Sequence, residues 1–300
     1  MTAAEYPLIQ KILATPAPAR LYHYTSPAGL IGIVTTRTLW ATHVRFLNDT
    51  AELNHALTPL RASIELRIGD RRHFSEPEID LLQAMLGMVG RGSHFVYVAA
   101  LTERRDDLSQ WRAYCPSAGG YAFGIPSGIL KTMAATQGYY LAPCVYDGKQ
   151  QQAVVNELVN QQILCYRQRT SGGDDGAKVK EEIVEAFSWE ATRYCATLKH
   201  RAFKDEQEWR LVSPHIPAGD LRISYRPGRT MMIPYVNFSF LDRPYDPRPV
   251  GGIDLDDTFQ VVVGPTVDPN ASMFAGQSIT MQHIGIGWCG WGGSDAPFRE

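Results

Sequence analysis

The sequence lacks several features that would assign it to a class at once. Its 300 residues contain no apolar run close to the roughly 18 residues that a membrane-spanning helix needs. The first 20 residues lack the cationic stretch and apolar segment of a secretory signal peptide. The chain has no internal repeat and no low-complexity segment. These absences predict an ordinary globular protein of the cytoplasm, with no membrane among its partners.

Cysteine is scarce, and its spacing argues against two kinds of scaffold. The five cysteines are odd in number and spread along the chain, and no two of them form a Cys-x-x-Cys pair. A disulfide framework or a zinc knuckle is therefore not expected, and reduced thiols are the simplest interpretation. The histidines also lack the spacing of a helical zinc motif, so the sequence predicts no metal site.

A strong overall charge is missing too. Lysine and arginine number 29 against 31 acidic residues, which gives a net charge of −2. Such a chain is not drawn to nucleic acid or to an anionic membrane by its overall field. Two local basic groups remain as candidates for a charged surface: Arg222, Arg226 and Arg229, and Lys199, His200, Arg201 and Lys204.

Short strand patterns and scattered helical patterns predict an α+β fold, because no regular strand-helix-strand alternation runs through the chain. Strands are expected at 21–25, 38–42, 95–101, 119–125, 140–146, 204–212, 221–225, 231–236, 259–265 and 279–284. Helices are expected at 3–14, 27–35 (with Leu30, Ile31, Ile33 and Val34 inward), 51–67, 76–89, 107–114 and 268–275. A helical insertion at about 148–200, broken by a loop at 170–176, decorates a single domain over residues 1–300.

The run 204–212 holds the most informative pair of residues, Glu206 and Glu208. Its apolar end and the turn signal that follows predict a short strand. Alternation along this strand would place both acids and Arg210 on one face, with Trp209 on the buried face. Crowded carboxylates raise each other's pKa and the arginine opposes this, so one acid could be tuned for chemistry. The alternative is an edge strand with a solvated ladder of charges.

His23 ends the first strand pattern, just before a helix start marked by Ser26 and Pro27. A strand histidine among apolar neighbours is commonly a structural residue. However, a strand histidine followed by a helix and a second extended segment resembles the first motif of ADP-ribosyltransferases. In that superfamily the histidine hydrogen-bonds the nicotinamide-side ribose of NAD.

Two further groups allow more than one interpretation. Trp111 and Tyr114 are three residues apart, so on a helix they share a face that serves either core packing or ligand stacking. Asn48 and Asp49 are typical of a helix cap, and with Glu52 they could instead present carboxylates to a pocket, so their role stays open.

A series of short motifs occurs in order along most of the chain. They are Leu21-Tyr22-His23-Tyr24-Thr25-Ser26, Leu39-Trp40-Ala41-Thr42, Phe46-Leu47-Asn48-Asp49 with Glu52, Trp111-x-x-Tyr114, Gly120 to Gly124, Glu206-x-Glu208-Trp209-Arg210, Val263-Gly264-Pro265 and Ser294-x-x-Pro297-Phe298-Arg299. With these motifs the chain, over about residues 21–299, resembles the family called domain of unknown function 2971. Where this family favours a short acidic or Ser-Glu stretch, the chain has Thr102-Glu103-Arg104-Arg105, so the loop 102–107 has no assigned role.

Together the two resemblances imply a site that cleaves NAD without a metal. A carboxylate can stabilise the positive charge that develops on the ribose, and an aromatic face can stack the nicotinamide. Glu208 would be the catalytic glutamate, Glu206 would help to receive the acceptor, and His23 would bind the ribose. The implied NAD-binding residues are His23, Tyr24, Thr25, Tyr121, Tyr114, Arg112 and Arg210, with Arg112 directed at a phosphate.

The implied protein is an NAD-dependent ADP-ribosyltransferase-like enzyme with a split, bent, mainly antiparallel sheet. It would be a toxin or defence effector that transfers ADP-ribose to a protein or nucleic-acid acceptor, and a neutralising protein could accompany it. One alternative is a metal-independent nuclease with His23 and Glu208 as acid and base and Arg210 as phosphate clamp. The other is a non-catalytic sensor or interaction module. The enzyme hypothesis requires His23 and Glu208 to share a pocket.

Overall fold

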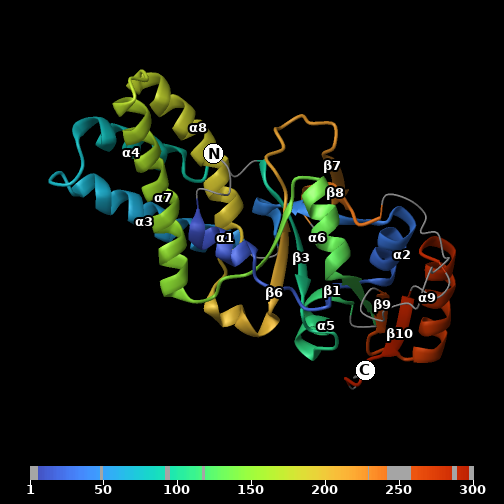
Figure 1. Cartoon of the computed structure of the whole chain (residues 1–300). Coiled ribbons are helices and arrows are strands. Elements are labelled where there is room, and N and C mark those ends of the chain that lie inside the picture. Colours follow the sequence, from blue (N-terminus) through green and yellow to red (C-terminus); the bar gives the residue numbers. More distant parts are fainter. Residues whose placement is uncertain are drawn as a thin grey trace.

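The computed structural model describes residues 6–47, 50–91, 95–116, 119–228, 230–241, 258–285 and 289–296. This part of the chain forms an open sheet with a lobe of helices beside it (Figure 1). The predicted α+β class is confirmed. The strands are β1 (Arg20–Thr25), β2 (Thr38–His43), β3 (Tyr97–Thr102), β4 (Tyr121–Pro126), β5 (Tyr140–Pro143), β6 (Glu208–Val212), β7 (Ser224–Pro227), β8 (Met232–Ser239), β9 (Phe259–Val263) and β10 (Cys289–Gly293).

The sheet is mixed and mostly antiparallel, and it splits around β3. Its main path runs β10-β9-β4-β1-β3-β2-β8-β7, and β6 joins β3 to β5 off this path. Along one edge of β3, residues 98–102 pair with β6. Along the other edge, Tyr97 and Val98 pair with β2, whereas only Thr102 pairs with β1. Since β1 and β2 diverge here, no described strand pairs with the middle of β3 on that edge.

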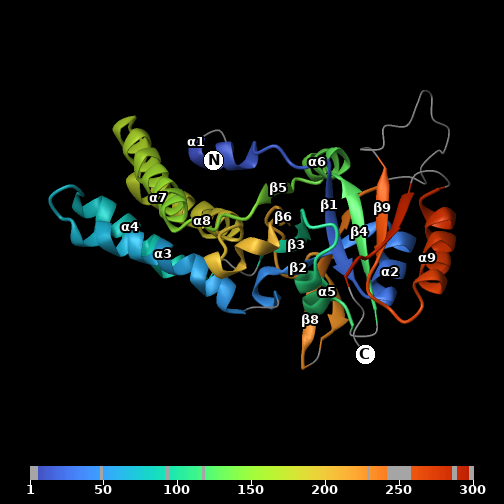
Figure 2. The same ribbon diagram turned by 90° about the horizontal axis from the view of Figure 1, so that it is seen from below.

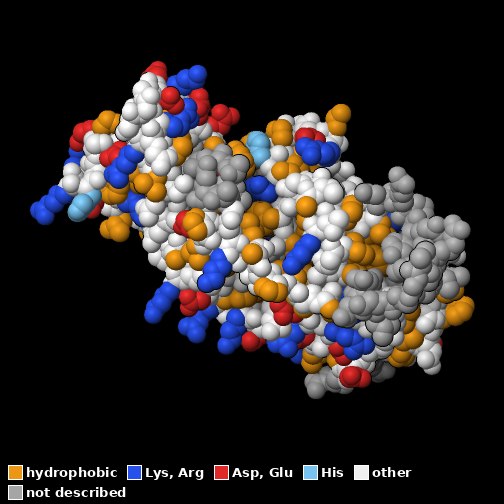
Figure 3. Space-filling model, in the orientation of Figure 1, with side chains coloured by type: hydrophobic (Ala, Val, Ile, Leu, Met, Phe, Trp, Pro, Cys, Tyr) orange, Lys and Arg blue, Asp and Glu red, His pale blue; other side chains and the backbone are white. Residues whose placement is uncertain are grey.

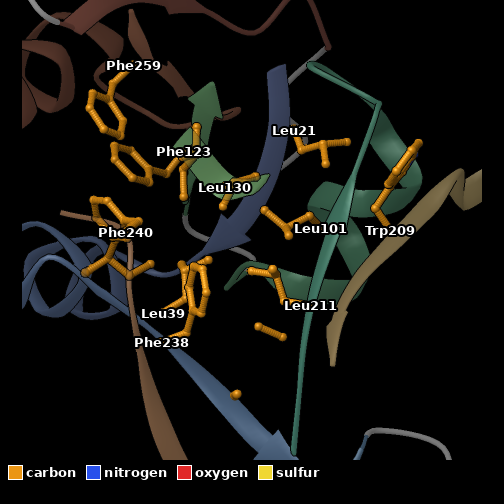
Figure 4. Packing of buried hydrophobic residues seen from close by; sticks show 14 of the residues in the cluster. Leu21, Leu39, Leu101, Phe123, Leu130, Trp209, Leu211, Phe238, Phe240 and Phe259 are labelled. Atoms are coloured by element: carbon orange, nitrogen blue, oxygen red, sulfur yellow. The ribbon is translucent and has the colours of Figure 1, made fainter. Parts of the chain in front are cut away.

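One core lies on a single face of the sheet. Alternate residues of the strands, such as Leu21, Leu101 and Leu211, point into it, as the two-residue period of a strand requires (Figure 4). Phe123 stacks on Phe259 there with ring centres 5.6 Å apart. The helices next to the sheet are α2 (Pro27–Thr36), α5 (Leu108–Tyr114), α6 (Ser127–Thr136) and α9 (Pro269–His283).

A second core holds the helical lobe together. Buried side chains of α7 recur every three or four residues, which gives the helix one apolar face. The predicted insertion over 148–200 supplies two of the helices, and three earlier ones pack against them to one side of the sheet (Figure 2). The lobe consists of α1 (Pro7–Leu13), α3 (Thr50–Gly69), α4 (Glu76–Met88), α7 (Gly148–Ser171) and α8 (Gly176–Cys195).

Several local predictions are confirmed. Ser26 caps α2 by accepting a hydrogen bond from the backbone nitrogen of Gly29 at 3.1 Å, and Pro27 is the first helical residue. Leu30 and its neighbours at 33 and 34 are buried as expected, but Ile31 is 52% exposed.

The C-terminal part of the chain corrects the predicted order of elements. The strand expected at 279–284 is wrong, because α9 continues to His283 from a cap at Asp268. The last strand is β10, which pairs in parallel with β9. The unit β9-α9-β10 is therefore a strand-helix-strand unit of the kind that the sequence patterns did not reveal. The strand expected at 221–225 begins only at Ser224.

The surface of the described residues carries charges of both signs, which Figure 3 shows interspersed over one face. No helix in the described ranges is both long enough and apolar enough to cross a membrane.

Candidate functional site

His23 fills the split in the sheet. Its Nδ1 lies 2.9 Å from the carbonyl oxygen of Ala100, in the middle of β3 where no strand pairs. A carbonyl can only accept, so we assign the proton to Nδ1, which leaves Nε2 as an acceptor. Burial lowers the pKa of His23, the bond to Ala100 opposes this, and the positive charge of Arg226 lowers it again. The imidazole is therefore neutral at pH 7.

The strand register brings Glu208 close to His23. Thr102 of β3 pairs with Glu208 of β6 on one edge and with Tyr22 of β1 on the other. Strands in a sheet are roughly 5 Å apart, so the backbones of Glu208 and Tyr22 are separated by about 10 Å. His23 is the next residue after Tyr22, and the two functional candidates thus come from strands that flank the same point of β3.

Glu208 lies in a buried network of charges. The residue is almost inaccessible, at 5% exposed, as are Arg210 at 4% and Lys199 at 2%. Arg210 donates to both carboxylate oxygens, from Nε to Oε1 at 2.6 Å and from Nη2 to Oε2 at 3.3 Å. Lys199 also donates to Oε2. The remaining nitrogen of Arg210, Nη1, donates to the carbonyl of Ala196 at 2.6 Å.

This network fixes the charge state of the acid. Burial alone would raise the pKa of Glu208, but Arg210 and Lys199 together hold it below its usual range. Burial likewise opposes the charge of Lys199, yet Glu208 and Glu206 raise the pKa of this lysine. At neutral pH the centre of the network is therefore a carboxylate held between two cations.

Lys199 separates the two acids that the sequence pattern placed side by side. Its Nζ lies 2.8 Å from Oε2 of Glu206 and also donates to Glu208. Mutual raising of pKa by crowded carboxylates is therefore not the dominant effect at Glu208. Sequence reasoning noted Lys199 only as one member of a basic group, because nothing in the run 199–204 shows that its side chain turns inward.

Glu206 and Glu208 do not belong to one strand. Residues Arg201–Glu206 form the 3-10 helix η4, and Gln207 adopts a left-handed conformation with φ of 44° before β6 begins. The predicted strand over 204–212 is wrong in its first half for this reason. Its second half is confirmed, since Glu208 and Arg210 share a face opposite the buried Trp209.

The loop 102–107, which had no assigned role, holds the corner between the two acids. Thr102 Oγ1 donates to the carbonyl of Glu206 at 2.6 Å, and the backbone nitrogen of Glu103 donates to the carbonyl of Gln207 at 3.2 Å. Trp209 Nε1 donates to Glu103 Oε1 at 2.7 Å. These bonds tie the corner to the end of β3 and support the strained backbone of Gln207.

A cavity of about 430 Å³ opens at the split, and His23, Glu208, Arg210 and Tyr114 all line it. A smaller hollow of about 60 Å³ shares three of these residues and also reaches Glu206. The larger volume falls within the roughly 300–1,000 Å³ of typical small-molecule sites.

The cavity brings together some of the NAD-binding candidates. Thr25 lines the larger cavity and Tyr24 lines the smaller hollow. The hydroxyl of Tyr24 is already engaged, because it donates to the carbonyl of Arg104 and accepts from the backbone nitrogen of Asp107, both at 3.0 Å. Tyr114 is partly exposed, and its hydroxyl lies 3.5 Å from Glu206 Oε2.

Two candidates lie elsewhere. Tyr121 donates its hydroxyl to the carbonyl of Ser272 at 3.0 Å and packs in the core of the sheet, so Tyr114 is the tyrosine at the cavity wall. Arg112 is exposed on α5 and lines neither hollow. Asn48, Asp49 and the side chain of Glu52 lie outside the described residues.

Two cavity residues were missed by the search for catalytic patterns. Arg226 of β7 and Trp40 of β2 both line the larger cavity. The sequence patterns that include them do not point to a site, since Arg226 belongs to a basic group and Trp40 to a family motif without an assigned role. Within the described ranges, no group of three or more metal-binding side chains comes together.

Fold and site thus define an α+β protein with a charged cavity at the split of its sheet. Residues 110–211 match the model of a family described as protein of unknown function (DUF2971), which confirms the predicted resemblance over this part of the chain. The matched segment includes Tyr114, Lys199, Glu206, Glu208 and Arg210, whereas His23 and Arg226 lie outside it. No curated protein and no solved structure matches the chain.

Proposed function

We propose that the cavity binds NAD and that the protein is an ADP-ribosyltransferase-like enzyme with a split-sheet core of that type. One observation carries the proposal: His23 and Glu208, from strands far apart in the sequence, line one cavity at the split of the sheet. The acceptor would be a protein or a nucleic acid. A toxin or defence effector in the cytoplasm, with a neutralising partner protein, is the biological setting that fits this activity.

The charge state of Glu208 suits the reaction. The bond between the ribose anomeric carbon and the nicotinamide nitrogen breaks, and its electron pair leaves with nicotinamide. The acceptor, or water, then bonds to that carbon and loses a proton. A carboxylate stabilises the positive charge that develops on the ribose, and Arg210 and Lys199 keep Glu208 charged and fixed.

His23 and Tyr114 supply the remaining contacts of the proposed site. The neutral ring of His23 keeps Nε2 as an acceptor for a ribose hydroxyl, since Nδ1 donates to Ala100. Tyr114 offers an aromatic surface for the nicotinamide. Glu206 lines the adjoining hollow and is more accessible than Glu208, which suits a residue that receives the acceptor.

The nuclease alternative has less support. A carboxyl group whose pKa is lowered does not donate a proton at neutral pH, so Glu208 cannot serve as the acid partner of His23. The guanidinium of Arg210 is bound to Glu208 and to the carbonyl of Ala196, which argues against its use as a phosphate clamp.

The test is release of nicotinamide from NAD, measured by chromatography, together with transfer of labelled ADP-ribose. Gly32→Leu is the decisive variant. Gly32 lines the cavity, and a Cβ atom added at this position meets no described atom within 4 Å, so the backbone can accept a leucine, which would take up space in the cavity and leave the charged residues unchanged. Leucine also favours the helix by about 1 kcal/mol over glycine. We expect a folded protein without activity.

Gly128→Leu is the matched control, because Gly128 is an exposed helical glycine of α6 with the same open surroundings, away from the cavity. It should keep full activity. Wild-type protein that releases no nicotinamide would refute the enzyme, as would full activity in Gly32→Leu. Cleavage of RNA without NAD would favour the nuclease, and neither activity would favour a sensor.

A further inference from the structure

Arg226 is a partly buried cation at the wall of the cavity. In the described part of the chain, no acidic side chain lies within ion-pair distance of its guanidinium. Its Nη2 donates to Thr42 Oγ1 at 3.1 Å. Its Nε is buried and has no hydrogen-bond partner among the described residues. Arginine keeps its charge in proteins, so a partly buried guanidinium in this state costs free energy.

The other charges of the cavity do not offset this one. Lys199 and Arg210 also line the cavity, but both are bound to Glu208, which is the one carboxylate among the described lining residues. Among these residues, the cation without a carboxylate partner is therefore Arg226. It lies near enough to His23 to lower the pKa of that ring. A low-dielectric cavity with an unbalanced cation attracts anions.

Packing accounts for only part of this arrangement. The guanidinium carbon lies 5.5 Å from the ring centre of Trp40, a favourable cation–π contact. Trp40 is itself 45% exposed although it lines the cavity. Its ring packs against the ring of Tyr235, with the ring centres 4.5 Å apart. The stack explains where the guanidinium lies, but it supplies no acceptor for Nε.

We propose that Arg226 is the anion subsite of the cavity and binds a phosphate of a nucleotide. A guanidinium matches phosphate oxygens with two parallel hydrogen bonds. The aromatic side chains of Phe46 and Tyr114 line the same cavity and suit a ligand that carries rings as well as charge. The choice of a nucleotide rests on the proposed function, which this assignment deepens by naming the residue that holds the phosphates.

The test is calorimetric titration with ADP, with inorganic pyrophosphate and with adenosine. Wild-type protein should bind both ADP and pyrophosphate. It should bind adenosine at least about tenfold more weakly than ADP, because adenosine cannot form the hydrogen bond to the charged guanidinium and the loss of one such bond lowers affinity by about this factor. Arg226→Gln should lose roughly tenfold to a hundredfold in ADP affinity. Arg222→Gln is the matched control, because Arg222 is exposed and paired with Asp220 at 2.6 Å, and it should bind ADP like wild type.

The stability of Arg226→Gln separates a binding role from a structural one. Removing an unbalanced cation should leave the melting temperature unchanged or raise it. A large fall in melting temperature with unchanged ADP affinity would overturn the subsite. Equal binding of adenosine and ADP, or no binding of ADP and pyrophosphate, would overturn it too. Protein that binds ADP through Arg226 but releases no nicotinamide would refute the enzyme and leave the subsite standing.

Discussion

Glu208→Gln is expected to destabilise the protein strongly, although the change barely alters the size of the side chain. Glutamine removes the charge that balances Arg210 and Lys199, and its amide group adds a donor where donors already converge. Lys199 keeps its bond to Glu206 at 2.8 Å, and Arg210 keeps its bond to the carbonyl of Ala196, but both cations lose the charged oxygens of Glu208. Breaking a buried ion pair by removing one partner costs about 3–5 kcal/mol.

The assay is thermal unfolding followed by circular dichroism, with the variant Arg210→Gln and the double variant as companions. For a chain of this size, each kcal/mol lowers the melting temperature by roughly 2–4 °C, so the single variant should melt about 6–20 °C lower. The double variant should lose less than the sum of the two single ones, because each single change leaves a buried partner uncompensated. Activity of Glu208→Gln must therefore be measured well below its melting temperature.

The effect should also depend on pH in a defined direction. The pKa of Glu208 is lowered in the folded protein, so the folded state binds fewer protons than the unfolded state. The stabilisation from Glu208 is complete when the pH is above the pKa of this residue in the unfolded chain, about 4.3. It disappears as the pH falls through the lower pKa of the folded protein. The stability gap between wild type and Glu208→Gln should be constant near pH 7 and narrow in acid. An unchanged melting temperature at pH 7, or a gap that widens in acid, would refute the reasoning.

Three further outcomes follow from the geometry of the site. Gln207 has φ of 44°, so Gln207→Gly should leave the melting temperature unchanged or raise it, whereas Gln207→Val should lower it. Similar effects of the two variants would show that the backbone at this residue is not strained. In an NMR titration, His23, assigned with a His23→Gln variant, should titrate below pH 6.5, and a higher value would show that burial does not dominate. Asp106→Ala should cost about 1–3 kcal/mol in chemical denaturation, because Asp106 accepts bonds from Trp111 Nε1 and Ser294 Oγ at 2.6 Å; a change of less than about 0.5 kcal/mol would argue against this role.

Local features of the fold could be read from the sequence because neighbouring residues decide them. Ser26 and Pro27 start α2 as predicted, and Asp107 caps α5 through backbone nitrogens within the same turn. The two-residue period placed Trp209 in the core and Glu208 with Arg210 on the other face. The long helices of the insertion followed from their apolar spacing. The same reasoning gave the wrong element at 279–284, because a short apolar run is compatible with a strand and with a helix.

The site itself depends on contacts between segments far apart in the chain. Residues Tyr22 and Glu208 meet across Thr102 only because β1 and β6 pair with opposite edges of β3, and sequence spacing carries no information on strand pairing. Tertiary packing likewise brought Lys199 between the two acids and left Nε of Arg226 without a hydrogen-bond partner among the described residues. The sequence determined which residue types were present and which way each strand faced. The charge state of Glu208 was decided by the fold, because a buried group takes its pKa from the partners that packing places around it.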